Sequence, residues 1–376
     1  MIYLDHAATS HPKAPGVVEA VRQALEGGFG TPGRGAHGPA LEAARLQFRV
    51  REACARSLGR ADAERLIFTR NATEALNLVI QGSVPDGGTV AVSSLEHHAV
   101  MRPLRMLEAT RGVQVRVVPF DACGNPDPAA LRTVLGLRPD LMVLTTASNV
   151  TGARTPVEAM AEACAARGVP LCLDASQTVG HRPLPRVAAT LCFSGHKGLL
   201  GPAGTGGVHL APDLDPRPLI LGGTGSRSDE ELQPEALPDR YESGTPNLPG
   251  LAGLGAALGF LEATGWERIQ ARERALCETL ARGLVALPGV RLHGPGPGDP
   301  REPVLSVSVE GWDPGELALA LDQRGICVRA GLHCAAAAHR TLGTLASGGT
   351  LRFSPGFSTT DAEIQATLEA LEDLLP

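Results

Sequence analysis

The residue whose type most clearly suggests a chemical reaction is Lys197, the last residue of the sequence Ser-Gly-His-Lys at positions 194–197. It is one of only two lysines in a chain that contains 34 Lys and Arg residues. Arginine cannot be deprotonated in a protein, whereas a lysine amine can lose its proton and form a Schiff base with a carbonyl group. The retained lysine therefore predicts amine chemistry. From this stretch alone, a surface lysine after a turn is the alternative interpretation.

The elements that must position Lys197 follow from the hydrophobic pattern. Between about residues 60 and 210, short apolar runs alternate with helical patterns. We predict strands at 66–69, 89–93, 141–145, 170–174 and 189–194, and helices at 72–81, 98–110 and 157–167. This spacing predicts an α/β fold whose mostly parallel sheet is covered on both faces.

Polar residues follow five of these predicted strands. They are Asn71–Thr73, Glu96–His98, Asn149, Asp174–Gln177 and Ser194–Lys197. Ligands bind beyond the carboxyl ends of the strands in such sheets. One cleft is therefore expected to collect these side chains.

The carboxylate of Asp174 indicates which ligand that cleft binds. It ends a buried strand, where an unpaired carboxylate is costly, so a cationic partner is expected. Beside a Schiff-base lysine, the natural partner is a protonated pyridine nitrogen, and this pairing makes pyridoxal 5′-phosphate (PLP) an electron sink. Gln177 and Asn149 are placed to hydrogen-bond the ring hydroxyl, and His97 is placed to stack on the ring.

A phosphate site is predicted where the helix after Asn71 begins. The backbone N–H groups of Ala72 and Thr73 and the Thr73 hydroxyl are suitable donors for a phosphate group. Ser194 and His196, beside the lysine, complete this site.

Each of these residues also has an ordinary structural interpretation. Asp174 or Thr73 alone is equally consistent with a helix cap, and His97 alone is better explained as a loop histidine. The PLP site is predicted because five such features follow one another in the right order along one sheet.

Composition excludes several other classes of protein. Hydrophobic residues are 43% and charged residues 20% of the chain, which is ordinary globular composition. A net charge of −6 without a basic block argues against nucleic-acid binding. No secretory signal or bilayer-spanning stretch is found, which predicts a cytoplasmic protein without membrane association. The eight cysteines form no C-x-x-C pair, so no metal site is expected.

Three parts of the chain are predicted. Residues 1–14 form an N-terminal segment that packs on a small domain, residues 15–255 form a large cofactor-binding domain, and residues 256–376 form the small α+β domain. A long helical region is expected at 248–287, and the last helix begins with a capping box at Thr360–Glu363.

The sequence resembles the class V aminotransferase branch of fold-type I PLP enzymes, and specifically the cysteine desulfurases. The resemblance rests on Asp174-x-x-Gln177 followed by Ser194–Lys197, and it extends from residues 3–9 to residues 351–354. It implies a fold-type I PLP-dependent transferase with a large domain built on a sheet of the seven-stranded type and a small C-terminal domain. It also implies that Lys197 forms the Schiff base, that Asp174 binds the ring nitrogen, and that Gln177 and Asn149 bind the ring hydroxyl. His97 would stack on the ring and take part in catalysis. The residues that would bind the phosphate are Ala72, Thr73, Ser194 and His196.

The resemblance further implies a homodimer. The segment Glu242–Pro246 is similar to the family segment that reaches across the dimer, where Thr245 would contact the neighbouring phosphate. Each site would then be completed by the partner subunit.

Two arginines are expected to bind the substrate. Arg352 matches the family arginine that holds the α-carboxylate, and a guanidinium suits this role because it forms two parallel hydrogen bonds. Arg329 is a second candidate, and Asn149 is also expected to bind the substrate. A surface arginine on an edge strand is the alternative interpretation of Arg352.

Cys334 is the expected nucleophile. It follows His333 in a stretch that resembles the Arg-x-Gly-x-His-Cys-Ala motif of desulfurases with a short, ordered cysteine loop. A thiol in a polar, partly exposed setting near an imidazole can become a thiolate. The motif usually has a proline soon after Cys-Ala, whereas this chain has four alanines, 335–338. A helix-start cysteine packed under those alanines is the alternative.

The resemblance therefore predicts a PLP-dependent cysteine desulfurase that converts L-cysteine to L-alanine, forms a persulfide on Cys334 and passes the sulfur to an acceptor protein. A cysteine or selenocysteine lyase, or a class V enzyme acting on another amino acid, is the second hypothesis. A non-catalytic binding subunit is the third, and the retention of Lys197, Asp174 and Arg352 argues against it.

Overall fold

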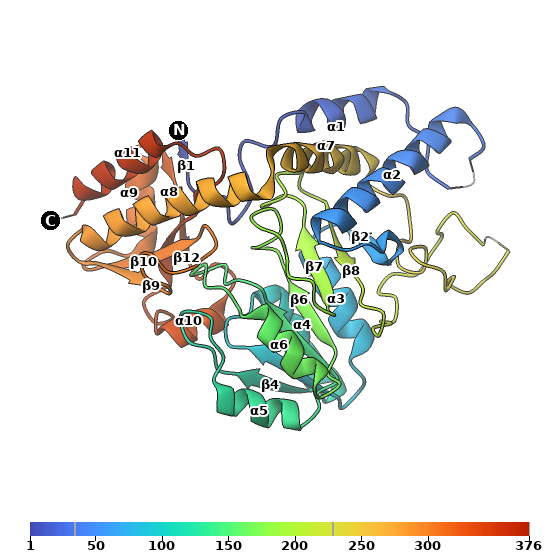
Figure 1. The fold of residues 1–376 in the computed structure, drawn as a ribbon, viewed down its shortest axis with the longest axis horizontal. Helices are drawn as coiled ribbons and strands as arrows, with labels where there is room; N and C mark the ends of the chain where they lie inside the picture. The colour runs from blue at the N-terminus through green and yellow to red at the C-terminus, as the bar shows by residue number, and fades with distance from the viewer. Residues whose placement is uncertain (34, 228, 376) are drawn as a thin grey trace.

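Two β-sheets organise the chain in the computed structural model, which describes residues 1–33, 35–227 and 229–375 (Figure 1). Within these ranges the larger sheet has seven strands in the order β2-β8-β7-β6-β5-β3-β4. They are β2 (Leu66–Thr69), β3 (Thr89–Ser93), β4 (Gln114–Val118), β5 (Leu141–Thr145), β6 (Leu171–Asp174), β7 (Thr190–Ser194) and β8 (Gly206–His209). All neighbouring strands from β4 to β7 are parallel, and β8 is antiparallel to both β7 and β2. The predicted mostly parallel α/β sheet is confirmed.

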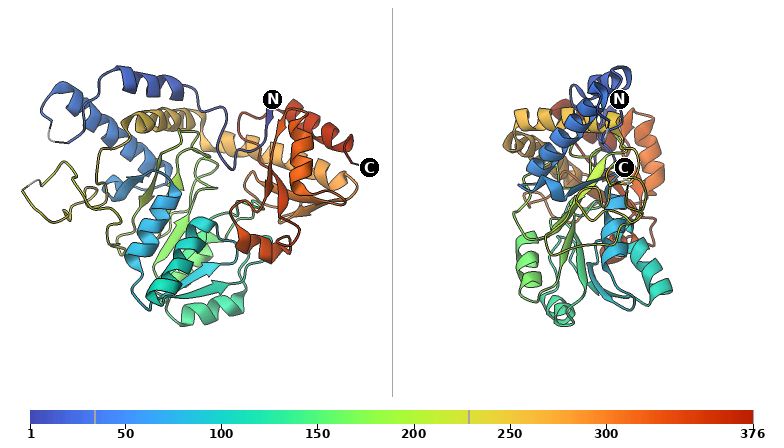
Figure 2. Two further views of the ribbon diagram at one scale, coloured as in Figure 1. Left: turned by 180° about the vertical axis from the view of Figure 1, so that it is seen from behind. Right: turned by 90° about the vertical axis from the view of Figure 1, so that its right-hand side faces the viewer.

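Helices cover both faces of this sheet (Figures 1 and 2). Successive residues of β5 alternate between two apolar cores, since Met142 and Leu144 belong to one and Leu141 and Val143 to the other. The first core includes residues of α6 (Val157–Ala165), and the second includes residues of α3 (Ala72–Ser83) and α4 (His98–Arg111). Because neighbouring residues of a strand point to opposite faces, a strand buried on both faces is apolar throughout.

The smaller sheet lies in the C-terminal part of the chain, orange to red in Figure 1. Its strands are antiparallel in the order β12-β13-β10-β9, with β9 (Val290–His293), β10 (Leu305–Val309), β12 (Arg329–Gly331) and β13 (Thr350–Phe353). The helices α8 (Trp266–Ala286), α9 (Pro314–Asp322) and α11 (Asp361–Glu372) share its apolar core. The predicted capping box at Thr360–Glu363 is present at the start of α11.

The predicted helical region at 248–287 is two helices. The first, α7 (Leu248–Thr264), ends at Gly265, and α8 begins at the next residue. Gly265 has φ 85°, a left-handed conformation that residues with a Cβ avoid, so the helix cannot run through it without a break. The predicted boundary between residues 255 and 256 falls within α7. The division of the chain into three parts stays a prediction.

The N-terminal segment connects the smaller sheet region to Lys197. β1 (Ile2–Tyr3) pairs in parallel with β11 (Ile326–Cys327). Farther along, the N–H of Ser10 donates to the carbonyl of His196 over 2.9 Å. The segment therefore reaches from the C-terminal part of the fold to the residue that precedes the lysine.

Several elements were not predicted from the sequence. They are β1, β4, β8, β9, α1 (Val17–Glu26), α2 (Gly38–Ser57), a short 3-10 turn (Ala63–Arg65), α5 (Pro128–Gly136) and α10 (Ala336–Leu342). In β8, a glycine at position 206 hides the strand pattern, because glycine has a low strand propensity. Packing requires this glycine, since a Cβ at position 206 would lie 2.7 Å from the Cα of Asn71. The glycine lets β8 approach the start of α3 closely.

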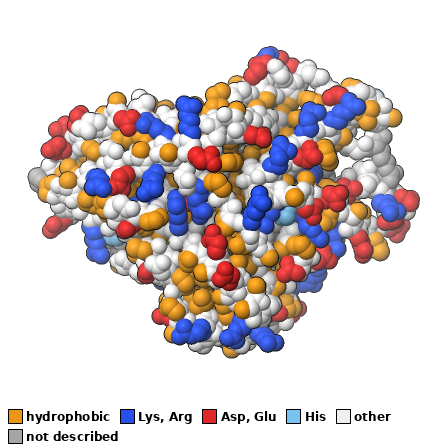
Figure 3. Space-filling model, in the orientation of Figure 1, with side chains coloured by type: hydrophobic (Ala, Val, Ile, Leu, Met, Phe, Trp, Pro, Cys, Tyr) orange, Lys and Arg blue, Asp and Glu red, His pale blue; other side chains and the backbone are white. Residues whose placement is uncertain are grey.

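The surface carries mixed charge. Lys and Arg side chains alternate with Asp and Glu on the face shown in Figure 3, without a large area of one sign. Among the described residues, no helix is both long enough and apolar enough to cross a membrane.

Candidate active site

The carboxyl ends of β6 and β7 bring Asp174 and Lys197 together. Asp174 is the last residue of β6, and it pairs in register with Cys192 of β7, two residues before that strand ends at Ser194. Lys197 follows three residues later and is half-buried. Its pKa is lowered by burial, while the charge of Asp174 acts in the opposite direction. A lysine with a lowered pKa holds a larger fraction of the free amine that nucleophilic chemistry requires.

Asp174 has one carboxylate oxygen engaged and one available. Oδ1 accepts hydrogen bonds from the backbone N–H of Ser176 at 3.0 Å and from its hydroxyl at 2.5 Å. Within the described parts of the chain, neither Oδ2 of Asp174 nor Nζ of Lys197 has a hydrogen-bond partner. The site therefore offers a free amine and a free carboxylate oxygen to a ligand that has both a carbonyl and a cationic group.

His97 lies at the same site as the N-cap of α4. Its Nδ1 accepts a hydrogen bond from the N–H of Ala99 at 3.0 Å. Burial lowers the pKa of His97 to about 4. The charge of Asp174 acts to raise this pKa, and the charge of Lys197 acts to lower it. The ring is therefore neutral at pH 7 with its proton on Nε2, which suits stacking on a cationic aromatic ring.

The predicted phosphate residues lie where α3 begins. Asn71 is the N-cap, and its side chain accepts from the N–H of Glu74. The N–H of Ala72 donates to the hydroxyl of buried Ser194 over 3.0 Å, so α3 and the end of β7 are in contact. Thr73 is exposed at the same helix start. The positive end of a helix dipole and a hydroxyl-bearing residue favour an anion here.

His196 is tied to the N-terminal segment. Its Nδ1 lies 3.1 Å from the hydroxyl of Thr9, and its pKa is lowered to about 4 by burial and by the charges of Lys197 and Lys13. Nζ of Lys13 donates to the carbonyl of His196 over 3.1 Å. Burial lowers the pKa of Lys13 to about 8. Lys197 follows His196 directly in the sequence, so both lysines of the chain lie next to His196.

The two predicted amide side chains are buried and bonded to backbone. Nε2 of Gln177 donates to the carbonyl of Ala7 at 3.0 Å, and Nδ2 of Asn149 donates to the carbonyl of His333 at 2.7 Å. These bonds connect the site to the N-terminal segment and to the cysteine loop. Contact with a ring hydroxyl stays a prediction for both residues.

Both candidate substrate arginines are paired with Asp5. Arg352 is 2% exposed, and its Nη2 donates to Oδ1 of Asp5 over 2.9 Å. Nη2 of Arg329 donates to Oδ2 of Asp5 over 2.8 Å. Nη1 of Arg352 donates to the carbonyl of Asn149, and its buried Nε has no partner among the described residues. The surface interpretation of Arg352 is therefore wrong.

Cys334 lies on an exposed, sharply turned loop. His333 and Cys334 have φ values of 48° and 55°, both in the left-handed region. The N–H of His98 donates to the carbonyl of Cys334 over 2.7 Å, which anchors the loop to the start of α4. The charge of Cys334 raises the pKa of Lys197, so the thiol lies within electrostatic range of the lysine. Cys334 is exposed, so the alternative of a thiol packed under the alanines is wrong.

The alanine run forms the start of a helix. α10 begins at Ala336, directly after the loop. Neither ring nitrogen of His333 bonds to the thiol, because Nε2 contacts the hydroxyl of Thr350 at 3.1 Å and Nδ1 is buried without a partner in the described chain. Burial lowers the pKa of His333 to about 2, so this imidazole is not a cation that stabilises a thiolate.

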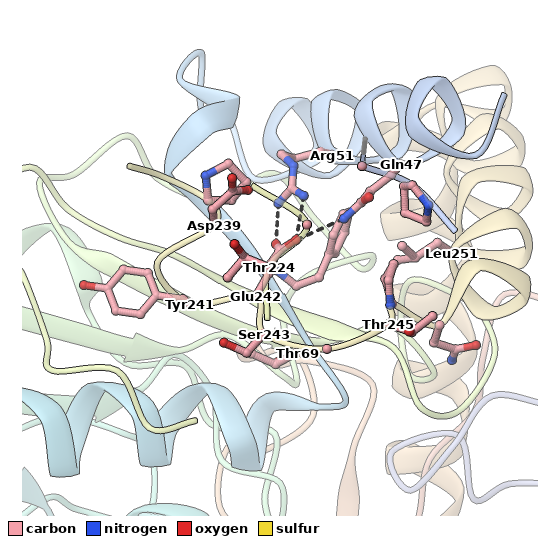
Figure 4. Close-up of a pocket in the computed structure, with 18 of the residues that line it drawn as sticks. Gln47, Arg51, Thr69, Thr224, Asp239, Tyr241, Glu242, Ser243, Thr245 and Leu251 are labelled. Carbon is pink, nitrogen blue, oxygen red and sulfur yellow. Dashed lines mark hydrogen bonds and ion pairs between the residues drawn. The ribbon is translucent and has the colours of Figure 1, made fainter. Parts of the chain in front are cut away.

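Thr245 lies apart from the lysine. It is exposed and lines a cavity of about 930 Å³ whose lining residues do not include Lys197, Asp174 or Ser194 (Figure 4). Glu242 fixes the segment that carries Thr245 through a two-bonded ion pair with buried Arg51, at 2.5 and 2.8 Å. Thr245 and Lys197 of one chain therefore do not line this cavity together.

Two residues of the site were missed from the sequence, and a third, Glu96, was expected in the cleft but was given no role. Asp5 holds the two arginines, Lys13 holds the His196 carbonyl, and Glu96 is fully buried beside the site. Oε1 of Glu96 accepts from the hydroxyl of Ser93 and from the N–H of Thr145. Glu96 adjoins His97 in a polar run at a strand end, which was the one available signal.

The fold and the site together define a PLP-type α/β enzyme, and comparison with known proteins gives its family. The model of the family described as aminotransferase class-V matches residues 2–367, so the chain belongs to that family. A probable cysteine desulfurase from Methanothermobacter thermautotrophicus is 34% identical, over 99% of this chain and 94% of its own length. A cysteine desulfurase from Pectobacterium atrosepticum is 33% identical, over 89% of this chain and 84% of its own.

Solved structures agree with this assignment. The apo structure of a cysteine desulfurase from Thermococcus onnurineus matches with a TM-score of 0.92 and 29% identity, over 100% of this chain and 94% of that one. A cysteine desulfurase from Escherichia coli in an S-sulfonic acid form matches with a TM-score of 0.86 and 28% identity, over 100% and 95% of the two chains.

Proposed function

We propose that this protein is a PLP-dependent cysteine desulfurase that releases sulfur from L-cysteine onto Cys334 and leaves L-alanine. The observation that carries the proposal is the exposed Cys334, on a loop that Asn149 and His98 anchor and within electrostatic range of Lys197. The family relatives named cysteine desulfurase support the choice among reactions of this fold.

The residues present fit PLP as the cofactor. Lys197 offers a free amine for its aldehyde, Oδ2 of Asp174 is free to accept from its ring nitrogen, and the neutral ring of His97 is available for stacking. The start of α3 with Ala72 and Thr73, together with Ser194 and His196, would hold the phosphate. Gln177 and Asn149 would reach the ring hydroxyl.

When bound, PLP supplies an electron sink that stabilises negative charge at the substrate Cα, and the carboxylate of Asp174 sustains this by holding the ring nitrogen protonated. Nζ of Lys197 takes the Cα proton, which requires the neutral amine that burial favours. Arg352 and Arg329 orient the substrate carboxylate, and Asp5 keeps both guanidinium groups in place.

Cys334 carries out the sulfur transfer. Its thiolate sulfur attacks the substrate Sγ, a sulfur–sulfur bond forms, and the substrate Cβ–Sγ bond breaks with its electron pair left on the carbon skeleton. Protonation of that skeleton gives alanine, so one cysteine and one thiol become one alanine and one persulfide. An exposed loop suits a persulfide that must reach a sulfur-acceptor protein.

The test compares two exposed cysteines. PLP-loaded wild-type protein, Cys334→Ser and Cys123→Ser are supplied with L-cysteine and dithiothreitol, and alanine, sulfide and pyruvate are quantified. We expect equimolar alanine and sulfide from the wild type and from Cys123→Ser, and loss of both from Cys334→Ser. Unchanged alanine formation by Cys334→Ser would refute the proposal, and pyruvate with ammonia would indicate a lyase instead.

A further inference from the structure

Two buried histidines lie directly under the Cys334 loop. His333 precedes the cysteine and is 8% exposed, and His339 lies in α10 and is 0% exposed. Their ring centroids are 5.6 Å apart, with an angle of 44° between the ring planes. The proposed reaction has no use for His339, although a buried imidazole is costly unless its nitrogens are hydrogen-bonded.

Each ring has one nitrogen bonded to a threonine. Nε2 of His333 lies 3.1 Å from the hydroxyl of Thr350, and Nδ1 of His339 lies 2.7 Å from the hydroxyl of Thr344. The other two nitrogens, Nδ1 of His333 and Nε2 of His339, are buried and lack a partner among the residues that the structure describes. Each of these nitrogens requires a polar partner, and rings whose centroids are 5.6 Å apart are near enough to share one.

The rings are suited to share one water molecule. Burial lowers the pKa of His333 to about 2 and of His339 to about 4, and the charge of Arg352 lowers that of His333 further. Both rings are therefore neutral, and a neutral imidazole has one donor and one acceptor nitrogen. A single buried water can hydrogen-bond to both free nitrogens.

The loop needs such support because its backbone is strained. His333 and Cys334 are consecutive residues with positive φ, a conformation that persists where the surroundings fix it. Asn149 and His98 hold the two loop carbonyls from the large domain. Support from the opposite side has to come from the residues beneath the loop.

We propose that His339 is a positioning residue that fixes the Cys334 loop through a water-bridged hydrogen bond from its Nε2 to Nδ1 of His333. The alanine run explains how His339 reaches this place. Ala337 and Ala338 are buried at 9% and 0% exposure in the two cores of the larger sheet, so small side chains let α10 pack closely against that part of the fold. The effect on catalysis rests on the proposed function of Cys334, whereas the bridge itself does not.

Two amide substitutions separate the two nitrogens of His339. In His339→Asn the amide lies near the position of Nδ1 and can still bond to Thr344, but it is too short to take part in the bridge. In His339→Gln the longer amide can occupy the position of Nε2 and keep the bridge. Gln also fills more of the imidazole volume than Asn and is the better helix former. Thermal unfolding of both variants is therefore measured as well, because a purely structural role would make loop exchange follow global stability.

The measurement is amide hydrogen exchange in the PLP-loaded protein, together with kcat and KM for L-cysteine. The N–H of His98 donates to the Cys334 carbonyl and that of Ala335 to the Leu332 carbonyl, so peptides that contain these two amides report on the loop. His209→Asn is the control, because His209 is also buried with an unpartnered Nδ1 in the described chain but lies on β8.

We expect exchange at both amides about tenfold faster in His339→Asn, with kcat about tenfold lower and KM unchanged. His339→Gln and His209→Asn stay within about twofold of the wild type in all of these. Wild-type exchange in His339→Asn, or equal impairment of His339→Gln and His339→Asn, overturns the proposal. If the wild type releases no sulfur from cysteine, the proposed function fails, and the exchange rates still decide whether the bridge exists.

Discussion

Asp5 determines how the two candidate substrate arginines can act. Its carboxylate accepts from Nη2 of both Arg352 and Arg329, and the Nε of Arg352 is left without a partner in the described chain. A substrate carboxylate that approaches Arg352 therefore meets a guanidinium already held in orientation. Little side-chain entropy is lost on binding, which favours affinity.

Arg352→Lys tests this arrangement. Lysine keeps the charge but cannot supply a planar pair of donors, and a hydrogen bond to a charged group contributes about 1.5–3 kcal/mol. We expect KM for L-cysteine to rise about tenfold or more, with a smaller change in kcat. Arg329→Lys is the matched control, because the Arg329 side chain is 49% exposed and a smaller rise in KM is expected. A larger rise in KM for Arg329→Lys than for Arg352→Lys would show that the substrate carboxylate binds Arg329 rather than Arg352.

Glu96 gives a prediction on pH dependence. Burial raises its pKa from 4.5 to about 8, while its bonds to Ser93 and Thr145 act in the opposite direction. Between these two values the folded state binds a proton that the unfolded state has released. The contribution of Glu96 to stability is therefore fully present below pH 4.5 and is lost as the pH rises through 8.

Glu96→Gln removes this titration while keeping the shape and an acceptor oxygen. The free energy of unfolding of the variant minus that of the wild type should rise by on the order of a few kcal/mol from pH 5 to pH 8.5. Urea unfolding of both proteins at the two pH values measures the difference, because all other titrating groups are shared. A difference in free energy of unfolding that is the same at both pH values would show that Glu96 ionises normally.

At the scale of elements, the turn after β6 supports the backbone next to Lys197. Gly180 has φ 95°, and a Cβ built on it would lie 2.0 Å from the carbonyl carbon of Gly198. Gly198 directly follows the lysine. Two backbone segments are therefore in contact where an alanine cannot fit without moving one of them.

Gly180→Ala should destabilise the protein by roughly 3 kcal/mol or more and weaken PLP binding, since the displaced segment carries Lys197. Gly168→Ala is the control: its φ is 64°, but the added Cβ would have no atom within 4 Å. Its cost is only the backbone strain, about 1–2 kcal/mol. Thermal unfolding and titration with PLP measure both effects. Equal effects of the two substitutions would mean that the contact with Gly198 is unimportant.

The elements also show which features a sequence can reveal. Asp174, Ser194 and Lys197 were found because each follows an apolar run that marks a buried strand, and parallel strands bring their carboxyl ends to one edge. Asp5 was missed because its partner Arg352 is 347 residues away, and no periodicity joins the two. β8 was missed because its glycines are selected by close packing, Gly206 against Asn71 and Gly207 against Ile67 and Phe193, rather than by strand propensity.

At the scale of the whole molecule, the cavity at Thr245 bears on the predicted homodimer. Its lining includes Phe48 and Ile220, which are 59% and 47% exposed. Large apolar side chains that are exposed around a cavity mark surfaces that bind a partner. Together with the absence of Lys197 from this lining, these exposed side chains support the predicted homodimer, whose sites would be completed across the interface.

Mixed dimers can test whether Thr245 acts on the partner's site. Lys197→Ala removes the amine, and Thr245→Arg blocks the proposed phosphate contact, so each homodimer is expected to be inactive. In a dimer with one subunit of each kind, one site would combine an intact Lys197 with an intact Thr245 from the other subunit. Unfolding and refolding an equal mixture should therefore restore about a quarter of the wild-type rate of alanine formation, because about half of the dimers are mixed and each has one complete site. If Thr245 served the lysine of its own chain, no mixed dimer would have a complete site and no activity would return.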